Sequence, residues 1–89
     1  MLVFILNAGS SSLKYQLMNP VSKEVLATGL CERIGIDGVL KHEFNENKLT
    51  LEVSMPTHKE AIELVLKTLV EGEGKVINSI DDIDAIGHR

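Results

Sequence analysis

The feature that most constrains the fold is a short, continuous apolar run at the start of the chain. Residues 2–6 are all apolar and largely branched, and a Gly-Ser-Ser-Ser stretch ends the run soon afterwards. Such a run is typical of a strand that is buried on both faces of a sheet. Residues 13–18 then alternate apolar and polar side chains, as in a strand with one covered face. Because the linker of residues 8–12 is too short for a crossover, we expect these two strands to pair antiparallel.

Four later segments also carry strand patterns. A third strand is predicted at about residues 23–33, after an Asn-Pro turn. Two alternating runs, at residues 39–44 and 48–53, flank a three-residue turn, and their polar faces indicate a hairpin at a sheet edge. A short apolar run at residues 83–87 predicts the last strand.

The strongest local signal is a helix start at Thr57. Thr57 and Glu60 have the spacing of a capping box, and apolar residues recur at helical spacing as far as about residue 71, where glycines end the helix. Because the last strand follows this helix, we expect it to lie parallel to its neighbour in the sheet. The sequence therefore predicts an α/β fold, a mixed sheet of about five to six strands with one main helix.

Composition excludes several classes of protein. The 89 residues include nine Lys and Arg against thirteen Asp and Glu, whereas a protein that binds duplex nucleic acid needs clustered basic residues. Aromatic residues make up only 3% of the chain, so base-stacking platforms are absent and an aliphatic core is expected. The single cysteine excludes an internal disulfide and fits a reducing, cytoplasmic setting. No apolar run approaches the length of a membrane helix. From the charge, the aromatic content and these short apolar runs, neither nucleic acid nor a membrane is an expected partner.

The residues that suggest chemistry are concentrated between the first two strands. They are Asn7, Gly9, Ser10, Ser11, Ser12 and Lys14. We expect Asn7, Ser10, Ser12 and Lys14 to cluster at one end of the sheet, with Asn7 and Lys14 on the same face. The glycine permits a tight backbone, successive amides form an anion-binding concavity, and the three hydroxyls add donors. The lysine contributes a positive charge, and the asparagine amide can orient the hydration shell of a metal ion. The stretch is not a Walker A loop, and a plain hairpin turn is the alternative to a phosphate site.

Arg89 is the second candidate site residue. It follows the last predicted strand, and ligands of open α/β sheets bind beyond the carboxyl ends of strands. A guanidinium there can bind a carboxylate or a phosphate through two N–H groups, and a solvated surface arginine is the alternative. The three histidines and the acidic residues Asp81, Asp82 and Asp84 lack the spacing of a metal site, and His58 is expected on the exposed first turn of the helix.

Four stretches in the same order resemble the acetate kinase family. They are residues 4–17 (Phe-Ile-Leu-Asn-Ala-Gly-Ser-Ser-Ser-Leu-Lys-Tyr-Gln-Leu), 29–35 (Gly-Leu-Cys-Glu-Arg-Ile-Gly), 56–59 (Pro-Thr-His-Lys) and 86–89 (Ile-Gly-His-Arg). The run Asn-Ala-Gly-Ser-Ser-Ser-Leu-Lys is highly specific, and the resemblance spans the whole chain. Propionate and butyrate kinases share versions of it.

The resemblance implies a fold, an activity and a set of site residues. Acetate kinases belong to the actin, hexokinase and Hsp70 superfamily, with two ribonuclease H-like domains. They reversibly transfer the γ-phosphoryl group of ATP to acetate, with Mg²⁺, giving acetyl phosphate and ADP. By this resemblance Asn7 binds magnesium, and Lys14 and the serines at 10–12 bind the nucleotide phosphates. Arg89 by the same resemblance binds the acyl substrate, and the parent enzyme is expected to be a homodimer in the cytoplasm.

Length separates this chain from the family it resembles. In the family, a catalytic Asp, a His, a second Arg and a Glu for magnesium follow the Gly-His-Arg motif. Residues 1–89 are therefore expected to be a partial domain, the N-terminal part of the first ribonuclease H-like domain, with no catalytic residue of its own and no activity alone. The alternatives are a propionate kinase fragment and a free-standing phosphate-binding or interaction module. Since one helix covers only one sheet face, the isolated chain is expected to self-associate through an apolar patch around Val3 and Ile5, or to be stable only beside the rest of its parent protein.

Overall fold

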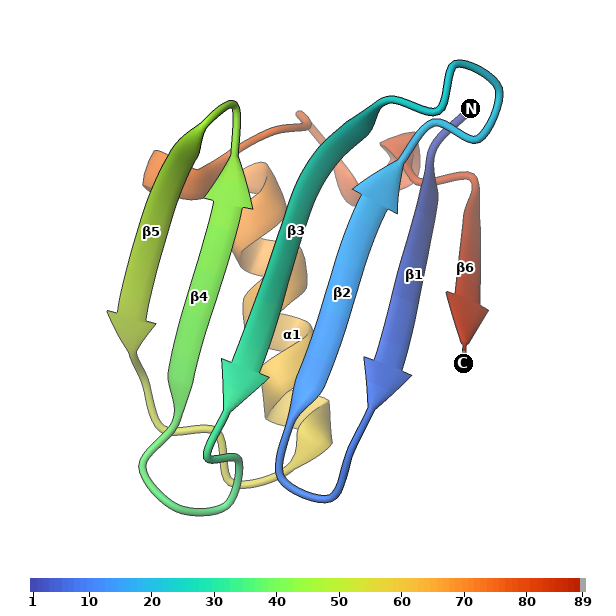
Figure 1. Ribbon diagram of the computed structural model, residues 1–89. Coiled ribbons are helices and arrows are strands. Elements are labelled where there is room, and N and C mark those ends of the chain that lie inside the picture. The colour runs from blue at the N-terminus through green and yellow to red at the C-terminus, as the bar shows by residue number, and fades with distance from the viewer. Residues whose placement is uncertain (89) are drawn as a thin grey trace.

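The computed structural model describes residues 1–88, in which six strands form one mixed sheet with a single long helix across one face (Figure 1). The strands are β1 (Val3–Ala8), β2 (Leu13–Met18), β3 (Val25–Glu32), β4 (Val39–Phe44), β5 (Asn47–Glu52) and β6 (Ala85–His88). The helices are α1 (His58–Val70) and two short 3₁₀ helices, η1 (Gly72–Gly74) and η2 (Ile80–Asp82). The predicted α/β class, the number of strands and the main helix are confirmed. Among the residues described, no helix has the length and apolar content needed to cross a membrane.

The strand β1 lies inside the sheet, whose order is β5-β4-β3-β2-β1-β6. It pairs antiparallel with β2, so that Asn7 lies opposite Lys14, and parallel with β6, so that Phe4 lies beside Ile86. Both predicted pairings are confirmed. The other neighbouring strands, from β2 to β5, pair antiparallel and follow one another along the chain.

Two strands begin later than predicted, because turns occupy their first residues. The strand β3 begins at Val25 rather than near residue 23, since Lys23 has a φ of 64° and its amide donates to the carbonyl oxygen of Asn19 at 2.7 Å. The strand β6 begins at Ala85 rather than at 83, since η2 and its capping residue Ser79 precede it.

The β4–β5 hairpin has a tighter turn than predicted. Phe44 pairs with Asn47, so the connection contains two residues rather than three. These two, Asn45 and Glu46, have φ values of 47° and 66°. Positive φ at both central positions is the geometry that matches the twist of a two-residue hairpin. A glutamate in such a turn is uncommon, and for this reason the sequence did not indicate it.

The helix α1 begins where the sequence predicts. Thr57 is its N-cap and accepts a hydrogen bond from the amide of Lys59 at 3.2 Å, while the carboxylate of Glu60 accepts from the amide of Thr57 at 3.0 Å. The hydrogen bond from the Thr57 hydroxyl keeps the pKa of Glu60 below its ordinary value. Ala61 and Leu69 are buried against the sheet. The cap therefore fixes where the helix begins, and the burial of its apolar side chains holds the helix against the sheet.

A row of rings crosses the covered face of the sheet. Tyr15 lies between Phe4 and His42, with ring centroids 6.0 and 5.8 Å apart, and His42 stacks on Phe44 at 5.1 Å. All three aromatic residues of the chain belong to this row. The rest of the buried core is mainly aliphatic, as expected, and the few aromatic residues lie in line on β1, β2 and β4.

His42 is fully buried and both of its ring nitrogens have partners. The carbonyl oxygen of Gly74 lies 2.9 Å from Nε2, so Nε2 carries the proton. Nδ1 then accepts from the hydroxyl of Tyr15 at 2.5 Å. Burial lowers the pKa of His42 and raises the pKa of Tyr15, so both side chains are held neutral. These hydrogen bonds connect β2, β4 and η1.

We predict that acid destabilises the folded chain through His42. Its pKa is lower in the folded chain than the ordinary value of 6.5, so the unfolded chain binds this proton first. The contribution is complete above pH 6.5 and is lost as the pH falls through the folded-state pKa, with a slope of at most about 1.4 kcal/mol per pH unit. Urea unfolding of the unsubstituted chain and of His42→Gln, from about pH 8 to about pH 5, measures this slope. Equal slopes in the two chains contradict the prediction.

Within the described residues, no helix covers the second face of the sheet. Val3 and Ile5 of β1 are half-buried there, while the strands β3 to β5 present charged side chains. These form ion pairs between Lys41 and Glu32, at 2.8 Å, and between Lys48 and Glu43, at 4.0 Å. The second face is therefore mixed rather than uniformly apolar, and self-association through it stays a prediction.

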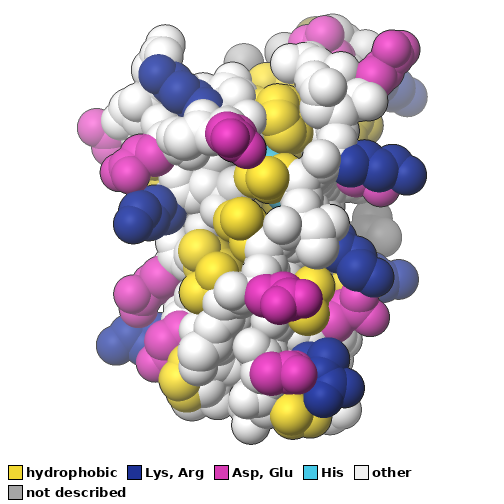
Figure 2. Space-filling view, turned by 90° about the vertical axis from the view of Figure 1, so that its left-hand side faces the viewer, with side chains coloured by type: hydrophobic (Ala, Val, Ile, Leu, Met, Phe, Trp, Pro, Cys, Tyr) yellow, Lys and Arg dark blue, Asp and Glu magenta, His cyan; other side chains and the backbone are white. Residues whose placement is uncertain are grey.

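An apolar seam runs along the β5 side of the molecule. Figure 2 looks at this side and shows hydrophobic side chains in a stripe between charged ones. A hollow of about 490 Å³ lies here, with Leu49 and Leu51 of β5 and Leu64 of α1 in its wall. The edge of the core is thus open to solvent between the sheet and the helix.

Two glycines with the same backbone conformation give a matched test of packing. Gly38 and Gly72 have φ values of 71° and 74°. A Cβ atom at Gly38 would lie 2.0 Å from the carbonyl oxygen of Val53, whereas a Cβ atom at Gly72 would meet nothing within 4 Å. We expect Gly72→Ala to cost about 1–2 kcal/mol, the cost of the left-handed backbone. Gly38→Ala should cost about 1–3 kcal/mol more, from the clash. Urea unfolding measures both, and equal losses would contradict the clash.

Candidate functional site

The serine-rich stretch forms the tight turn between β1 and β2, at the lower end of the sheet in Figure 1. The amide of Gly9 donates to the carbonyl oxygen of Ser12 at 2.9 Å, and the amide of Ile34 donates to that of Ser11 at 3.0 Å. Ser10 and Ser11 are exposed and Ser12 is half-buried. In the part of the chain that the structure describes, the amides of residues 10–12 donate to no protein group. Three successive amides are therefore free to bind an anion.

Asn7 and Lys14 lie directly opposite each other beside this turn. Their register places both side chains on the uncovered face of the sheet, as the alternation of side chains predicts. Both are exposed, and they line a hollow of about 280 Å³ together with Ile5, Gln16 and Thr28. The predicted placement of Asn7 and Lys14 on one face, at the end of the sheet that carries the turn, is confirmed.

The sequence interpretation missed the role of His58 in this region. His58 is the first residue of α1, yet it is half-buried rather than exposed. Its Nε2 lies 2.7 Å from the carbonyl oxygen of Gly9 and 3.1 Å from that of Ser12. Because both partners are carbonyl oxygens, Nε2 must carry a proton and donate. The capping box at Thr57 predicted only where the helix begins. Nothing in the sequence indicated that the side chain of His58 contacts a glycine 49 residues away.

Arg89, the predicted acyl-binding residue, lies outside the described residues. The strand before it, β6, ends at His88 beside Leu6 of β1. Two of the acidic residues near this strand accept hydrogen bonds from backbone amides. Asp82 accepts from the amide of Ser79 at 3.2 Å, and Asp84 accepts from the amide of Leu2 at 2.7 Å.

The donor set near the turn fits a metal ion only in the company of a phosphate. Among residues 1–88, no three or more His, Cys, Asp or Glu side chains are grouped so that they could hold a metal ion. Asn7 offers one amide oxygen, and Lys14 beside it is a cation. Mg²⁺ commonly keeps several water molecules and binds through few protein oxygens and the phosphates of a substrate. The site therefore fits Mg²⁺ that arrives with a nucleotide.

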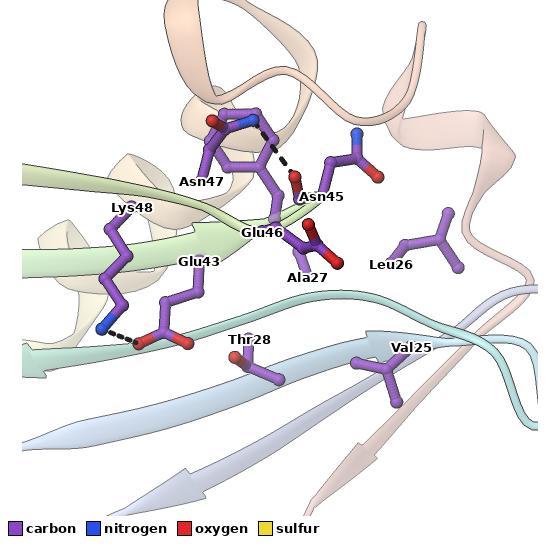
Figure 3. Close-up of a pocket in the computed structure, with 10 residues that line it drawn as sticks. Val25, Leu26, Ala27, Thr28, Glu43, Asn45, Glu46, Asn47 and Lys48 are labelled. Atoms are coloured by element: carbon purple, nitrogen blue, oxygen red, sulfur yellow. Dashed lines mark hydrogen bonds and ion pairs between the residues drawn. The ribbon is translucent and has the colours of Figure 1, made fainter.

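A second hollow lies at the opposite end of the sheet, around the β4–β5 turn. Figure 3 shows its wall, and its volume is about 200 Å³. Lys48 pairs with Glu43, and the side chain of Asn47 donates to the carbonyl oxygen of Asn45 at 3.3 Å. The polar groups of this hollow therefore already bind one another. The hollow beside Asn7 and Lys14 is therefore the stronger candidate for ligand binding.

The fold, a six-stranded sheet with a parallel last strand, matches solved structures of proteins with the actin-like ATPase fold. The chain belongs to the acetokinase family, whose model matches residues 2–89. It is 54% identical to the acetate kinase of Fusobacterium nucleatum over 95 residues, which cover all of this chain and 23% of that protein. It is 56% identical to the acetate kinase of Agathobacter rectalis over 89 residues, which cover 98% of this chain and 22% of that protein.

Solved structures give the same result. The chain superposes on Porphyromonas gingivalis acetate kinase with a TM-score of 0.95 and 40% identity, over 99% of this chain and 23% of that one. It superposes on a propionate kinase from Francisella tularensis with a TM-score of 0.82 and 32% identity, over 99% of this chain and 22% of that one. The chain thus spans less than a quarter of the length of these relatives.

We predict that Gly9 is needed because Ser12 packs against it. A Cβ atom at Gly9 would lie 2.6 Å from the Oγ atom of Ser12, so Gly9→Ala must displace that hydroxyl. We expect Gly9→Ala to cost about 1 kcal/mol of stability, and the Gly9→Ala/Ser12→Ala double variant to recover most of it. Urea unfolding of the two single variants and the double variant gives the coupling free energy. Additive losses would show that the two side chains do not interact.

Proposed function

We propose that residues 1–89 form the N-terminal part of an acetate kinase, within its first ribonuclease H-like domain. The parent enzyme would transfer the γ-phosphoryl group of ATP to acetate, giving acetyl phosphate and ADP, and would catalyse the reverse reaction. The observation that carries the proposal is the pairing of Asn7 with Lys14 beside a turn whose amides are free, in a chain of the acetokinase family. This arrangement supports one wall of a phosphoryl-transfer site.

The residues of this wall bind and orient phosphates in the proposed reaction. Lys14 neutralises charge on the nucleotide, and the amides and hydroxyls of Ser10, Ser11 and Ser12 donate to phosphate oxygens. Asn7 holds or orients Mg²⁺ through its amide oxygen. When bound, Mg²⁺ neutralises the charge that develops on the phosphates. Arg89 would bind the carboxylate of the acyl substrate.

No residue of this segment is assigned a proton transfer. The carboxylate of acetate is itself the nucleophile, so the reaction needs alignment and charge neutralisation more than a general base. Cys31 is buried, which raises the pKa of its thiol to about 11, and it takes no part. A free thiol is consistent with the reducing cytoplasm, where we place the parent enzyme.

Propionate is the second candidate acceptor. The superposition on a propionate kinase, with a TM-score of 0.82, favours this alternative, although the match to an acetate kinase has the higher TM-score, 0.95. Both reactions would use the same phosphate-binding wall, because the two acceptors share the carboxylate and differ only in their alkyl group.

A chimaeric enzyme tests the proposal. Residues 1–89 replace the matching segment of the Agathobacter rectalis acetate kinase, to which they are 56% identical. We expect this chimaera to form acetyl phosphate from ATP and acetate, measured by hydroxamate trapping, and the 89-residue chain alone to give no signal above the blank. Lys14→Met should lower the activity of the chimaera by about 10²-fold, the typical effect of losing one charge-stabilising group.

Lys48→Met is the matched control, because Lys48 is an exposed lysine on β5, at the far end of the sheet. This variant should retain full activity. Activity of the isolated chain, or an active Lys14→Met chimaera, would contradict the proposal. Preference of the chimaera for propionate over acetate would favour the second candidate.

A further inference from the structure

His58 contacts the serine-rich turn from the side of α1. We propose that His58 is a positioning residue for phosphate binding. By donating from Nε2 to the carbonyl oxygens of Gly9 and Ser12, it holds the turn in the form that leaves the amides of residues 10–12 free. The inference rests on the proposed function, and it assigns a role to a residue on a different element from the turn.

The two carbonyl oxygens explain why such a contact matters for an anion. A carbonyl oxygen carries partial negative charge and repels a phosphate, whereas an amide N–H attracts it. A turn of this length contains both kinds of group. The hydrogen bonds to His58 keep the carbonyls of Gly9 and Ser12 directed toward α1. The turn then presents its donors to a ligand and not its acceptors.

The position of His58 is itself fixed by the core. Thr57 and Glu60 close the capping box around it, and Ala61 in the next turn of the helix is fully buried. The side chain of His58 therefore projects from a helix start that is fixed by the capping box and by the burial of Ala61. A flexible surface histidine could not order a loop in this way, because its own conformational entropy would be lost in the contact.

Among residues 1–88, the turn has three attachments through hydrogen bonds, and of these only His58 comes from the helix. The first is the bond from the Gly9 amide to Ser12, which closes the turn, and the second is the bond from Ile34 to Ser11. Without His58, the carbonyl of Ser12 would keep its bond from the Gly9 amide, but that of Gly9 would lose the bond from α1. The turn would then be free to rotate its peptide groups.

The protonation state of Nε2 distinguishes a positioning role of His58 from a role in proton transfer. A donor to two carbonyl oxygens carries its proton on Nε2 in both the neutral ring and the imidazolium. A general base at this atom would need Nε2 without a proton. Nitrogen-15 NMR of the ring in the 89-residue chain distinguishes the two, and we expect a protonated Nε2 across the whole pH range in which the protein is folded.

Two variants of this chain test the role of the contact. His58→Gln keeps an N–H donor near the place of Nε2, and His58→Leu removes the donor while keeping a similar volume. We expect His58→Leu to lower the backbone order parameters of residues 10–12 in this chain, and to raise the KM of the chimaera for MgATP about tenfold. His58→Gln should stay within about twofold of the unsubstituted chain, since it retains the hydrogen bond. Unchanged amide shifts in the β4–β5 hairpin show that each variant is folded.

The outcomes distinguish this inference from the proposed function. Equal order parameters and equal KM values for MgATP with all three side chains at this position overturn the role of His58, as does an unprotonated Nε2. A raised KM in both variants also overturns it, because the donor would then not be the feature that matters. Failure of the unsubstituted chimaera to form acetyl phosphate, with an ordered turn, instead overturns the phosphate-binding function on which the inference rests.

Discussion

The placement of Asn7 and Lys14 depends on the burial of one sheet face under α1. Phe4, Leu13 and Leu17 are buried on that face, and each large apolar side chain contributes roughly 1.5–3 kcal/mol on burial. Because side chains alternate along a strand, packing these residues against the helix forces Asn7 and Lys14 to the other face. A slip of one residue in register would expose the core and bury the lysine. The hydrophobic effect thus sets the position of a polar site that it does not touch.

The helix has a second effect on the site, through its first residue. The same capping box that starts α1 places His58 against the turn between β1 and β2. Core packing, helix capping and the form of the turn are therefore linked in one short path. A substitution that destabilises the start of the helix would therefore also change the conformation of the turn, although no ligand-binding residue is substituted.

Features set by neighbouring residues could be predicted from the sequence. The short linker and the alternation after it predicted that β1 and β2 pair antiparallel and that Asn7 and Lys14 share a face. The spacing of Thr57 and Glu60 predicted the helix start. These relations span few residues, and simple steric and hydrogen-bonding rules govern them.

Features that depend on how distant elements dock could not be predicted. The bond from His58 to Gly9 joins residues 49 apart, and it exists only because α1 lies across the sheet with its first turn near the loop. The contact between His42 and Gly74 joins residues 32 apart and depends on the path of the chain after the helix. A histidine in an alternating pattern gives no sign of which carbonyl it will meet. Arg89 remains a prediction, because the resemblance names it and the described structure does not include it.

The parallel pairing of β6 with β1 has a consequence for the order in which the structure is assembled. The strands β1 to β5 follow one another as antiparallel neighbours, so each pairing closes a short loop, whereas the bond between Leu2 and Asp84 joins residues 82 apart. Closing long loops is entropically costly and comes late in folding. We therefore expect the serine-rich turn to form with the first hairpin during synthesis, and the last strand to dock onto a sheet that already carries Asn7, Lys14 and this turn.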